Sequence, residues 1–208
     1  MITSKTIVCA IALVALPCSV FADYFVRPEI DYVLPQDKNK GSSEATVGYG
    51  LSFGTQLGSA REHEVSLDVL YWNENKSRIQ TVPAPTASFT WKHKMLPVLL
   101  SYRYYAGPTD GRVRLFLGAL AGATYADESF LANTSNAAAS GTVATSHWLP
   151  TIGGTAGVEI KAADHVSFQL GYRYLHMFER DFGNPPALVY HPGSYDAHVF
   201  TGAVSFKF

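Results

Sequence analysis

Eight segments of this chain alternate apolar and polar side chains over about ten residues or more. Successive side chains of a β-strand point to opposite faces, so each segment predicts a strand with one apolar face. The segments are about Tyr24–Leu34, Glu44–Leu57, His63–Asn73, Lys92–Tyr105, Arg112–Tyr125, His147–Lys161, His165–Phe178 and Tyr195–Phe208. After residue 22 the longest apolar run, Leu115–Ala123, is too short for a membrane helix. Any membrane span must therefore be made of strands.

The last segment ends the chain on an aromatic residue. Its apolar face carries Phe200, Gly202, Val204, Phe206 and Phe208. The other face carries Thr201, Ala203, Ser205 and Lys207. An apolar strand that stops on phenylalanine without a polar tail is typical of the closing strand of an outer-membrane barrel, which turns one face to lipid.

Residues 1–22 predict a secretory signal peptide. Lys5 precedes the apolar run Ile7–Leu16, and Val20-Phe21-Ala22 forms an acceptable cleavage pattern. Both cysteines, Cys9 and Cys18, lie in this segment, so residues 23–208 contain no thiol, disulfide or thiolate metal site. We expect an exported chain whose residues 23–208 form a single barrel domain.

The charge composition excludes one class of partner and favours another. The formal net charge is −1, so no nucleic-acid-binding surface is predicted. Charged residues make up 16% of the chain, below the ~25% usual for soluble domains. This composition favours a membrane environment.

The connections between the predicted strands alternate in length. Those after the first, third, fifth and seventh strands are long, and Asp127–Ser146 and Glu179–Ser194 are predicted as long loops. An antiparallel meander would place all the long connections at one end and both termini at the other. Outer-membrane barrels have this asymmetry, with short periplasmic turns and long external loops. The prediction is an all-β, eight-stranded antiparallel up-and-down transmembrane barrel.

A soluble barrel, apolar inside and polar outside, is the alternative. The polar faces of the segments are rich in Gly, Ser and Thr rather than Lys and Glu, which suits a narrow interior better than a solvated exterior. Aromatic residues near the strand ends suit the water–lipid boundary. These are Tyr24, Tyr32, Tyr71, Tyr104, Trp148 and Tyr174. Together with the loop asymmetry, they favour the membrane barrel.

Charged residues on the polar faces predict a network in the lumen. The members are Arg27, Glu29, Asp31, Asp68, Arg103, Arg114, Glu159, Arg173 and Lys207. Unpaired charges in a narrow lumen would be costly, so we expect salt bridges and bound water. Lys207 is expected within reach of Glu29 or Asp31. The network is interpreted as structural, with a gate or narrow ion path as the alternative.

The eight segments, the signal peptide and the terminal VSFKF sequence resemble the small OmpA/OmpX-type outer-membrane β-barrel family over residues 23–208. The resemblance implies an integral protein of the bacterial outer membrane, in contact with its lipid. It also implies that the barrel-insertion machinery recognises Phe200, Val204, Phe206 and Phe208 as an assembly signal, with Gly202 interrupting the apolar series. Members of the family include structural proteins, adhesins, surface antigens, small channels and a few lipid-modifying enzymes.

The predicted function is a non-enzymatic surface role, with external loops that bind a ligand or host partner. A narrow channel is one alternative, and a lipid A-modifying enzyme is another. His165 and Ser167 form an H-x-S pair similar to that of outer-membrane lipid A deacylases, but they follow a turn predicted at the periplasmic end. His147, His176, His191 and His198 have no tight metal-ligand spacing. No catalytic residue, cofactor or metal is therefore predicted.

Overall fold

The computed structural model describes residues 23–37, 41–42, 45–80, 87–108, 111–134, 141–178 and 194–208. The predicted signal peptide and residues 179–193 lie outside this part. The strands are β1 (Asp23–Asp37), β2 (Gly41–Ser42), β3 (Thr46–Leu57), β4 (His63–Gln80), β5 (Ala87–Ala106), β6 (Val113–Thr134), β7 (Gly141–Ala163), β8 (Val166–Met177) and β9 (Tyr195–Lys207). Within the described ranges, no helix is long and apolar enough to cross a membrane.

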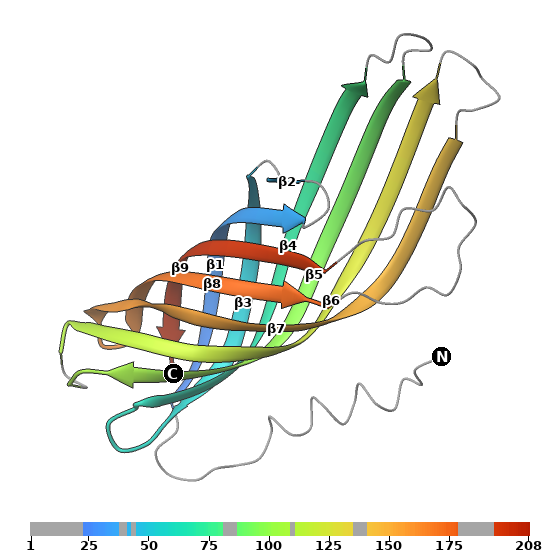
Figure 1. Ribbon diagram of the computed structural model, residues 1–208. Helices are drawn as coiled ribbons and strands as arrows, with labels where there is room; N and C mark the ends of the chain where they lie inside the picture. Colours follow the sequence, from blue (N-terminus) through green and yellow to red (C-terminus); the bar gives the residue numbers. More distant parts are fainter. Residues whose placement is uncertain are drawn as a thin grey trace.

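Eight of these strands form a closed antiparallel barrel (Figure 1). Neighbours in the sheet follow chain order from β3 to β9, and β1 pairs with both β3 and β9. The closing seam runs from Phe25↔Lys207 to Asp37↔Tyr195. The two-residue β2 adds a short pairing to the end of β1. The predicted eight-stranded up-and-down architecture is confirmed.

Three short connections and the ends of β1 and β9 lie together at one end of the barrel, which we call the short-turn end. The amide of Phe208 donates to the carbonyl of Tyr24 at 2.9 Å, so the first and last strands meet there. In the turn between β3 and β4, the amide of Arg61 donates to the carbonyl of Gly58 at 3.1 Å. We call the opposite end the extended end.

Strands β4 to β7 continue past the other four at the extended end (Figure 1). They have 18, 20, 22 and 23 residues, against 12 in β8. The predicted loop Asp127–Ser146 is therefore wrong over most of its length, because β6 reaches Thr134 and β7 begins at Gly141. The connection predicted between β4 and β5 is likewise shortened to residues 81–86. Backbone pairing with neighbouring strands extends these segments beyond the region where an apolar face is required.

The outer face of the barrel is apolar. All six aromatic residues predicted at strand ends on this face are exposed: Tyr24, Tyr32, Tyr71, Tyr104, Trp148 and Tyr174. Aliphatic side chains such as Ile30, Leu117 and Leu170 are also exposed, at 62%, 68% and 59%. Exposed apolar surface on this scale needs a lipid covering.

The inner face differs between the two halves of the barrel. The half nearest the short turns holds most of the buried charged side chains. Farther toward the extended end, a buried apolar cluster fills the interior, formed by Val33, Leu70, Trp72, Met95, Leu99, Leu120, Ala126, Leu149, Leu175, Met177, Tyr195, Ala197 and Val199. The expectation of a polar lumen thus holds for one half only. The apolar half closes the interior by packing, which requires no hydrogen-bond partners.

Candidate functional site: the filled lumen and the extended end

The structure places all nine predicted charged residues on the inner side of the wall. Eight are buried, and Lys207 is half-buried at the short-turn end. They come from β1, β4, β5, β6, β7, β8 and β9, so they approach one another from around the barrel. The three on β1 are two residues apart, which directs them to the same face, and each of the other strands contributes one inward residue.

Glu64 is the shared acceptor of one group of residues in this network, formed with Arg27, Arg103 and Tyr105. Arg27 donates two hydrogen bonds to its carboxylate, at 3.0 and 2.7 Å. Tyr105 donates to it at 2.8 Å, and Arg103 lies 3.4 Å away as an ion-pair partner. The Glu64 side chain is fully buried, so these donors supply the stabilisation that water would otherwise give a carboxylate.

Asp68 connects the Glu64 group to Arg173 of β8. Ser66 and Ser101 donate to its two oxygens at 2.8 and 2.6 Å. Arg103 reaches it at 3.3 Å and Arg173 at 3.7 Å. One buried carboxylate of β4 is thus bonded to β5 and lies beside the guanidinium of β8.

The remaining predicted residues form pairs of their own. Arg173 donates to both oxygens of Glu29, at 2.7 and 2.8 Å. Asp31 accepts a hydrogen bond from Thr201 at 2.6 Å. Arg114 is the exception, since its hydrogen bonds go to the carbonyls of Ala60 and Arg61.

The expected partner of Lys207 is wrong. Its ammonium group lies 2.7 Å from Glu159 of β7, not beside Glu29 or Asp31 of the paired strand β1. Lys207 is opposite Phe25 in the register, at the rim, so the two carboxylates of β1 lie deeper in the barrel. The inward direction of Lys207 agrees with the face assigned to it, and the ion pair crosses β8.

Several uncharged or boundary residues of the network were missing from the prediction. Glu64 and Gln56 follow the inward alternation of β4 and β3, and Tyr105 follows that of β5. Gln169 donates to Tyr105 at 3.0 Å and to Glu159 at 2.9 Å, so it connects the Glu64 group to Glu159. The alternation contained this signal: extending each inward face by one more step would have found Glu64 and Tyr105.

The network consists of ion pairs and hydrogen bonds between buried side chains. Its carboxylates are held by guanidinium, ammonium, hydroxyl and amide donors in a closed, buried layer. The apolar cluster lies beyond it toward the extended end. Together the two layers fill the interior in series.

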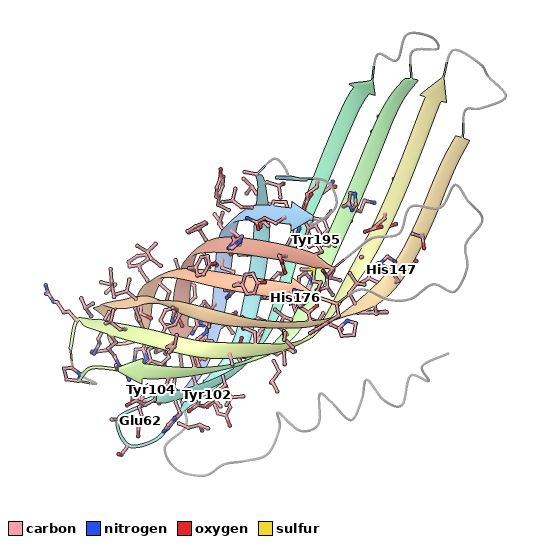
Figure 2. All side chains as sticks on the ribbon, viewed as in Figure 1. Glu62, Tyr102, Tyr104, His147, His176 and Tyr195 are labelled. Atoms are coloured by element: carbon pink, nitrogen blue, oxygen red, sulfur yellow. The ribbon has the colours of Figure 1, made fainter. Side chains whose placement is uncertain are left out.

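A second set of polar side chains lies inside the wall at the extended end. Glu74, His93, Glu128 and His147 come from the four long strands and are all buried. His93 and Glu128 form a pair at 3.3 Å, and Tyr195 donates a hydrogen bond to Glu74. Figure 2 shows His147 and Tyr195 at this end, with Glu62, Tyr102 and Tyr104 at the opposite end.

Histidines on the outer wall pair with tyrosine and aspartate. His176 lies 2.5 Å from Asp196, which also accepts a hydrogen bond from Tyr174 at 2.9 Å. His198 bonds to the hydroxyl of Tyr172 at 2.6 Å. His63 bonds to Tyr102 at 2.8 Å near the short turns. These contacts suit interfacial anchoring, because amphipathic rings favour the boundary of the bilayer.

The histidines considered as metal ligands do not converge. His147 lies on the inner face, whereas His176 and His198 lie on the outer face, and His191 is outside the described residues. In the part of the chain that the structure describes, no group of three or more His, Cys, Asp or Glu side chains could hold a metal ion.

The two residues of the H-x-S pair lie in different surroundings, because one is in a turn and the other is on a strand. Ser167 is buried inside the barrel. His165 lies in the exposed turn before β8, and its carbonyl accepts from the amide of Lys207 at 2.8 Å. The Ser167 hydroxyl has no hydrogen-bond partner among the described residues. The pair therefore lacks the hydrogen bond between nucleophile and base that acyl transfer requires.

The predicted assembly-signal residues lie on the lipid side of β9. Phe200, Phe206 and Phe208 are exposed, and Val204 is half-buried. Gly202 lies between them on the same face, where an added Cβ would meet no other atom within 4 Å. Recognition of this face by insertion machinery stays a prediction.

Solved structures of known barrels resemble this fold. Neisserial surface protein A aligns with a TM-score of 0.54 at 13% identity, covering 91% of this chain and 100% of that one. A major outer membrane protein of Thermus thermophilus gives a TM-score of 0.51 at 13% identity, with 91% and 100% coverage. Ail, the attachment invasion locus protein of Yersinia pestis, gives 0.50 at 9% identity, with the same coverage. At these identities the likeness shows the fold alone.

Sequence comparison identifies the family. Among curated proteins, no relative matches the chain. The family model for the outer membrane protein beta-barrel domain matches residues 8–208. With a closed eight-stranded antiparallel barrel and a lipid-facing apolar exterior, the chain belongs to the outer membrane protein β-barrel family and is an integral protein of the bacterial outer membrane.

Proposed function

We propose that this protein has a non-enzymatic surface role and binds a ligand or host partner through the part of β4–β7 that projects from the membrane. The length of these strands is the observation that carries the proposal. A tilted strand crosses a bilayer in about 9–11 residues. β6 has 22 residues and β7 has 23, so about half of each strand is not needed to cross the membrane.

The outer face of the wall indicates where the lipid ends. The rings of Tyr125 and Trp148 contact each other with centroids 5.4 Å apart, as in an interfacial aromatic belt. The next outward residue of β6 is Asp127, which lies 3.8 Å from Lys94 of β5. Outer-membrane barrels keep short turns in the periplasm, which puts this charged stretch outside the cell. From Asp127 to Thr134 the strand extends roughly 25 Å, at about 3.3 Å per residue.

The projecting segments are paired with one another rather than free. Pairing of β4 with β5 continues to Gln80↔Ala87, and pairing of β6 with β7 continues to Ala132↔Gly141. A paired sheet presents its side chains and connections in a fixed arrangement, which lowers the entropic cost of binding. Connections on such a scaffold are common places for recognition.

The filled interior supports binding over conduction. The apolar cluster and the charged network occupy successive parts of the interior with buried side chains. A channel would need a continuous polar path through both layers.

The test is to shorten the extension in register while the barrel stays intact. Ser129 and Ala144 are paired opposite each other, and so are Asn75 and Lys92. Replacing residues 130–143, or residues 76–91, with Asn-Gly would close each pair with a two-residue hairpin turn. Cells that express each variant would be compared with wild type for retention on immobilised extracellular-matrix protein and on a sulfated-glycan surface.

We expect wild-type cells to be retained on at least one of these surfaces and both shortened variants to lose retention. A change of electrophoretic mobility on boiling shows that each variant still forms a barrel. Lys161→Gln, at the opposite end, is the matched control and should not alter retention. Equal retention by the shortened variants would refute the proposal. Stepwise conductance of the wild type in a planar bilayer would favour a channel instead.

A further inference from the structure

We propose that the periplasmic mouth of this barrel binds a phosphate-type oxyanion. A small pocket opens there between the start of β6, the end of β7 and the start of β8. Cationic and hydroxyl groups that line it belong to Arg61, Arg112, Arg114, Lys161, Ser167 and Lys207. The site is at the opposite end of the protein from the projecting strands, so it is independent of the proposed surface binding.

The charges of the pocket do not balance. Its two carboxylates are already paired: Glu159 with Lys207 at 2.7 Å and Asp164 with Lys161 at 2.9 Å. Arg61 pairs with Asp23 at 2.8 Å. The guanidinium groups of Arg112 and Arg114 have no carboxylate partner among the described residues. Among the described residues that line the pocket, five are cationic and two are anionic, so positive charge is in excess there.

Arg114 has the greatest need for an anion. It is 4% exposed, and its Nη2 donates to the carbonyls of Ala60 and Arg61 at 3.2 and 2.9 Å. Its Nε is buried without an acceptor in the described part of the chain. Glu159 lies opposite Arg114 in the register of β6 and β7, but its carboxylate is bonded to Lys207 and Gln169. A buried guanidinium with an unmet donor is costly, and an oxyanion would supply both a negative charge and the missing acceptor.

Ser167 gives a second, independent indication. It lines the same pocket from β8 and is 1% exposed. Its hydroxyl has no hydrogen-bond partner within the described residues. A buried hydroxyl is normally hydrogen-bonded, and an oxyanion seated beside Arg114 would accept a hydrogen bond from it.

Phosphate is the ligand chemistry that these donors fit. A guanidinium donates through several N–H groups in a planar fork, which matches the oxygens of phosphate. Arg112 on the rim adds charge that attracts an anion to the mouth. Two sources share this chemistry: free phosphate in the periplasm and the headgroup phosphate of a lipid in the inner leaflet.

The test is phosphorus-31 NMR on the barrel extracted from outer membranes into a phosphate-free maltoside detergent. Inorganic phosphate is titrated, and its line width reports binding. We expect Arg114→Gln to weaken binding about tenfold or more, since it removes a charge-assisted hydrogen bond. Arg112→Gln and Ser167→Ala should weaken it less. Lys94→Gln, a cation at the far end of the barrel, is the control and should bind as the wild type does.

A second titration with phosphatidylglycerol in the same micelles distinguishes the sources. Broadening of the lipid signal alone, lost in Arg114→Gln, would assign the site to a headgroup, and broadening of free phosphate would assign it to a soluble anion. If Arg114→Gln does not fold, as shown by the absence of a mobility change on boiling, the binding measured for Arg112→Gln and Ser167→Ala tests the proposal. Absence of binding in both titrations, or equal binding by all variants, would overturn the proposal.

Discussion

Arg173 and Glu29 are 144 residues apart in sequence, and they form a bidentate ion pair inside the barrel, with distances of 2.7 and 2.8 Å. The pair joins β8 to β1 across the intervening strand β9. It therefore ties together the three strands that close the barrel. A bidentate pair in a buried site also fixes the position of both side chains.

Removing one partner of this pair should be strongly destabilising. Arg173→Ala leaves Glu29 buried without its main donor, and we expect a loss of about 3–5 kcal/mol in the free energy of unfolding. Urea-induced unfolding from lipid vesicles would measure it. Lys94→Ala, which removes an exposed pair with Asp127, should cost about 0–1 kcal/mol. A double mutant of Glu29 and Arg173 that loses as much as the two single mutants summed would contradict the coupling.

Glu64 should be at least as sensitive, although it was not among the predicted residues. Glu64→Gln keeps the shape of the side chain but removes the charge that faces Arg27 and Arg103. We expect a loss of roughly 3 kcal/mol or more, because two buried guanidinium groups lose their negative partner and one carboxylate oxygen is replaced by a donor. The same unfolding assay applies, with Asp127→Asn at the exposed end as control. A change in Glu64→Gln no larger than in the control would show that Glu64 is not the centre of the network.

The sequence predicted the barrel because lipid imposes a simple rule on every crossing strand. One face must be apolar, so alternation marks each strand and also identifies the inward residues. Glu64 is harder to recognise, because it is the first inward residue of β4 and lies at the edge of the alternating segment. The ion-pair partners could not be predicted, since they depend on the stagger of the strands. Lys207 illustrates this: it pairs with Glu159, two strands away from it in the sheet.

The extension of β4–β7 was hidden for a related reason. Beyond the lipid boundary no face needs to be apolar, so the alternation ends near Tyr125 while the strand continues to Thr134. The small and polar residues of Asp127–Ser146 have the composition of a loop. Their pairing across β6 and β7 depends on contacts with neighbouring strands, which the local sequence pattern does not predict.

Two glycines on opposite faces of the wall should respond oppositely to alanine. A Cβ at Gly157, inside the barrel, would overlap the carbonyl of Leu170 and the ring of Phe116. Gly157→Ala should cost about 1–3 kcal/mol through overpacking. A Cβ at Gly202, on the lipid side, would meet nothing within 4 Å. Gly202→Ala should stabilise the barrel by about 0.5–1 kcal/mol, because glycine weakens a strand. Unfolding of both variants in vesicles would detect the difference in sign, and a shared sign would contradict the face assignment.

The two layers that fill the interior make a prediction about conduction. Trp72 is almost fully buried in the apolar cluster, and Trp72→Ala should cost about 3–5 kcal/mol by leaving a cavity. It should not produce a channel, because the charged network around Asp68 still closes the barrel on the periplasmic side. Arg173→Ala should likewise remain silent, because the apolar cluster is intact. Planar-bilayer recordings would test both variants against the wild type. Stepwise currents from either single variant would contradict this prediction, because they would show that the remaining layer does not prevent conduction by itself.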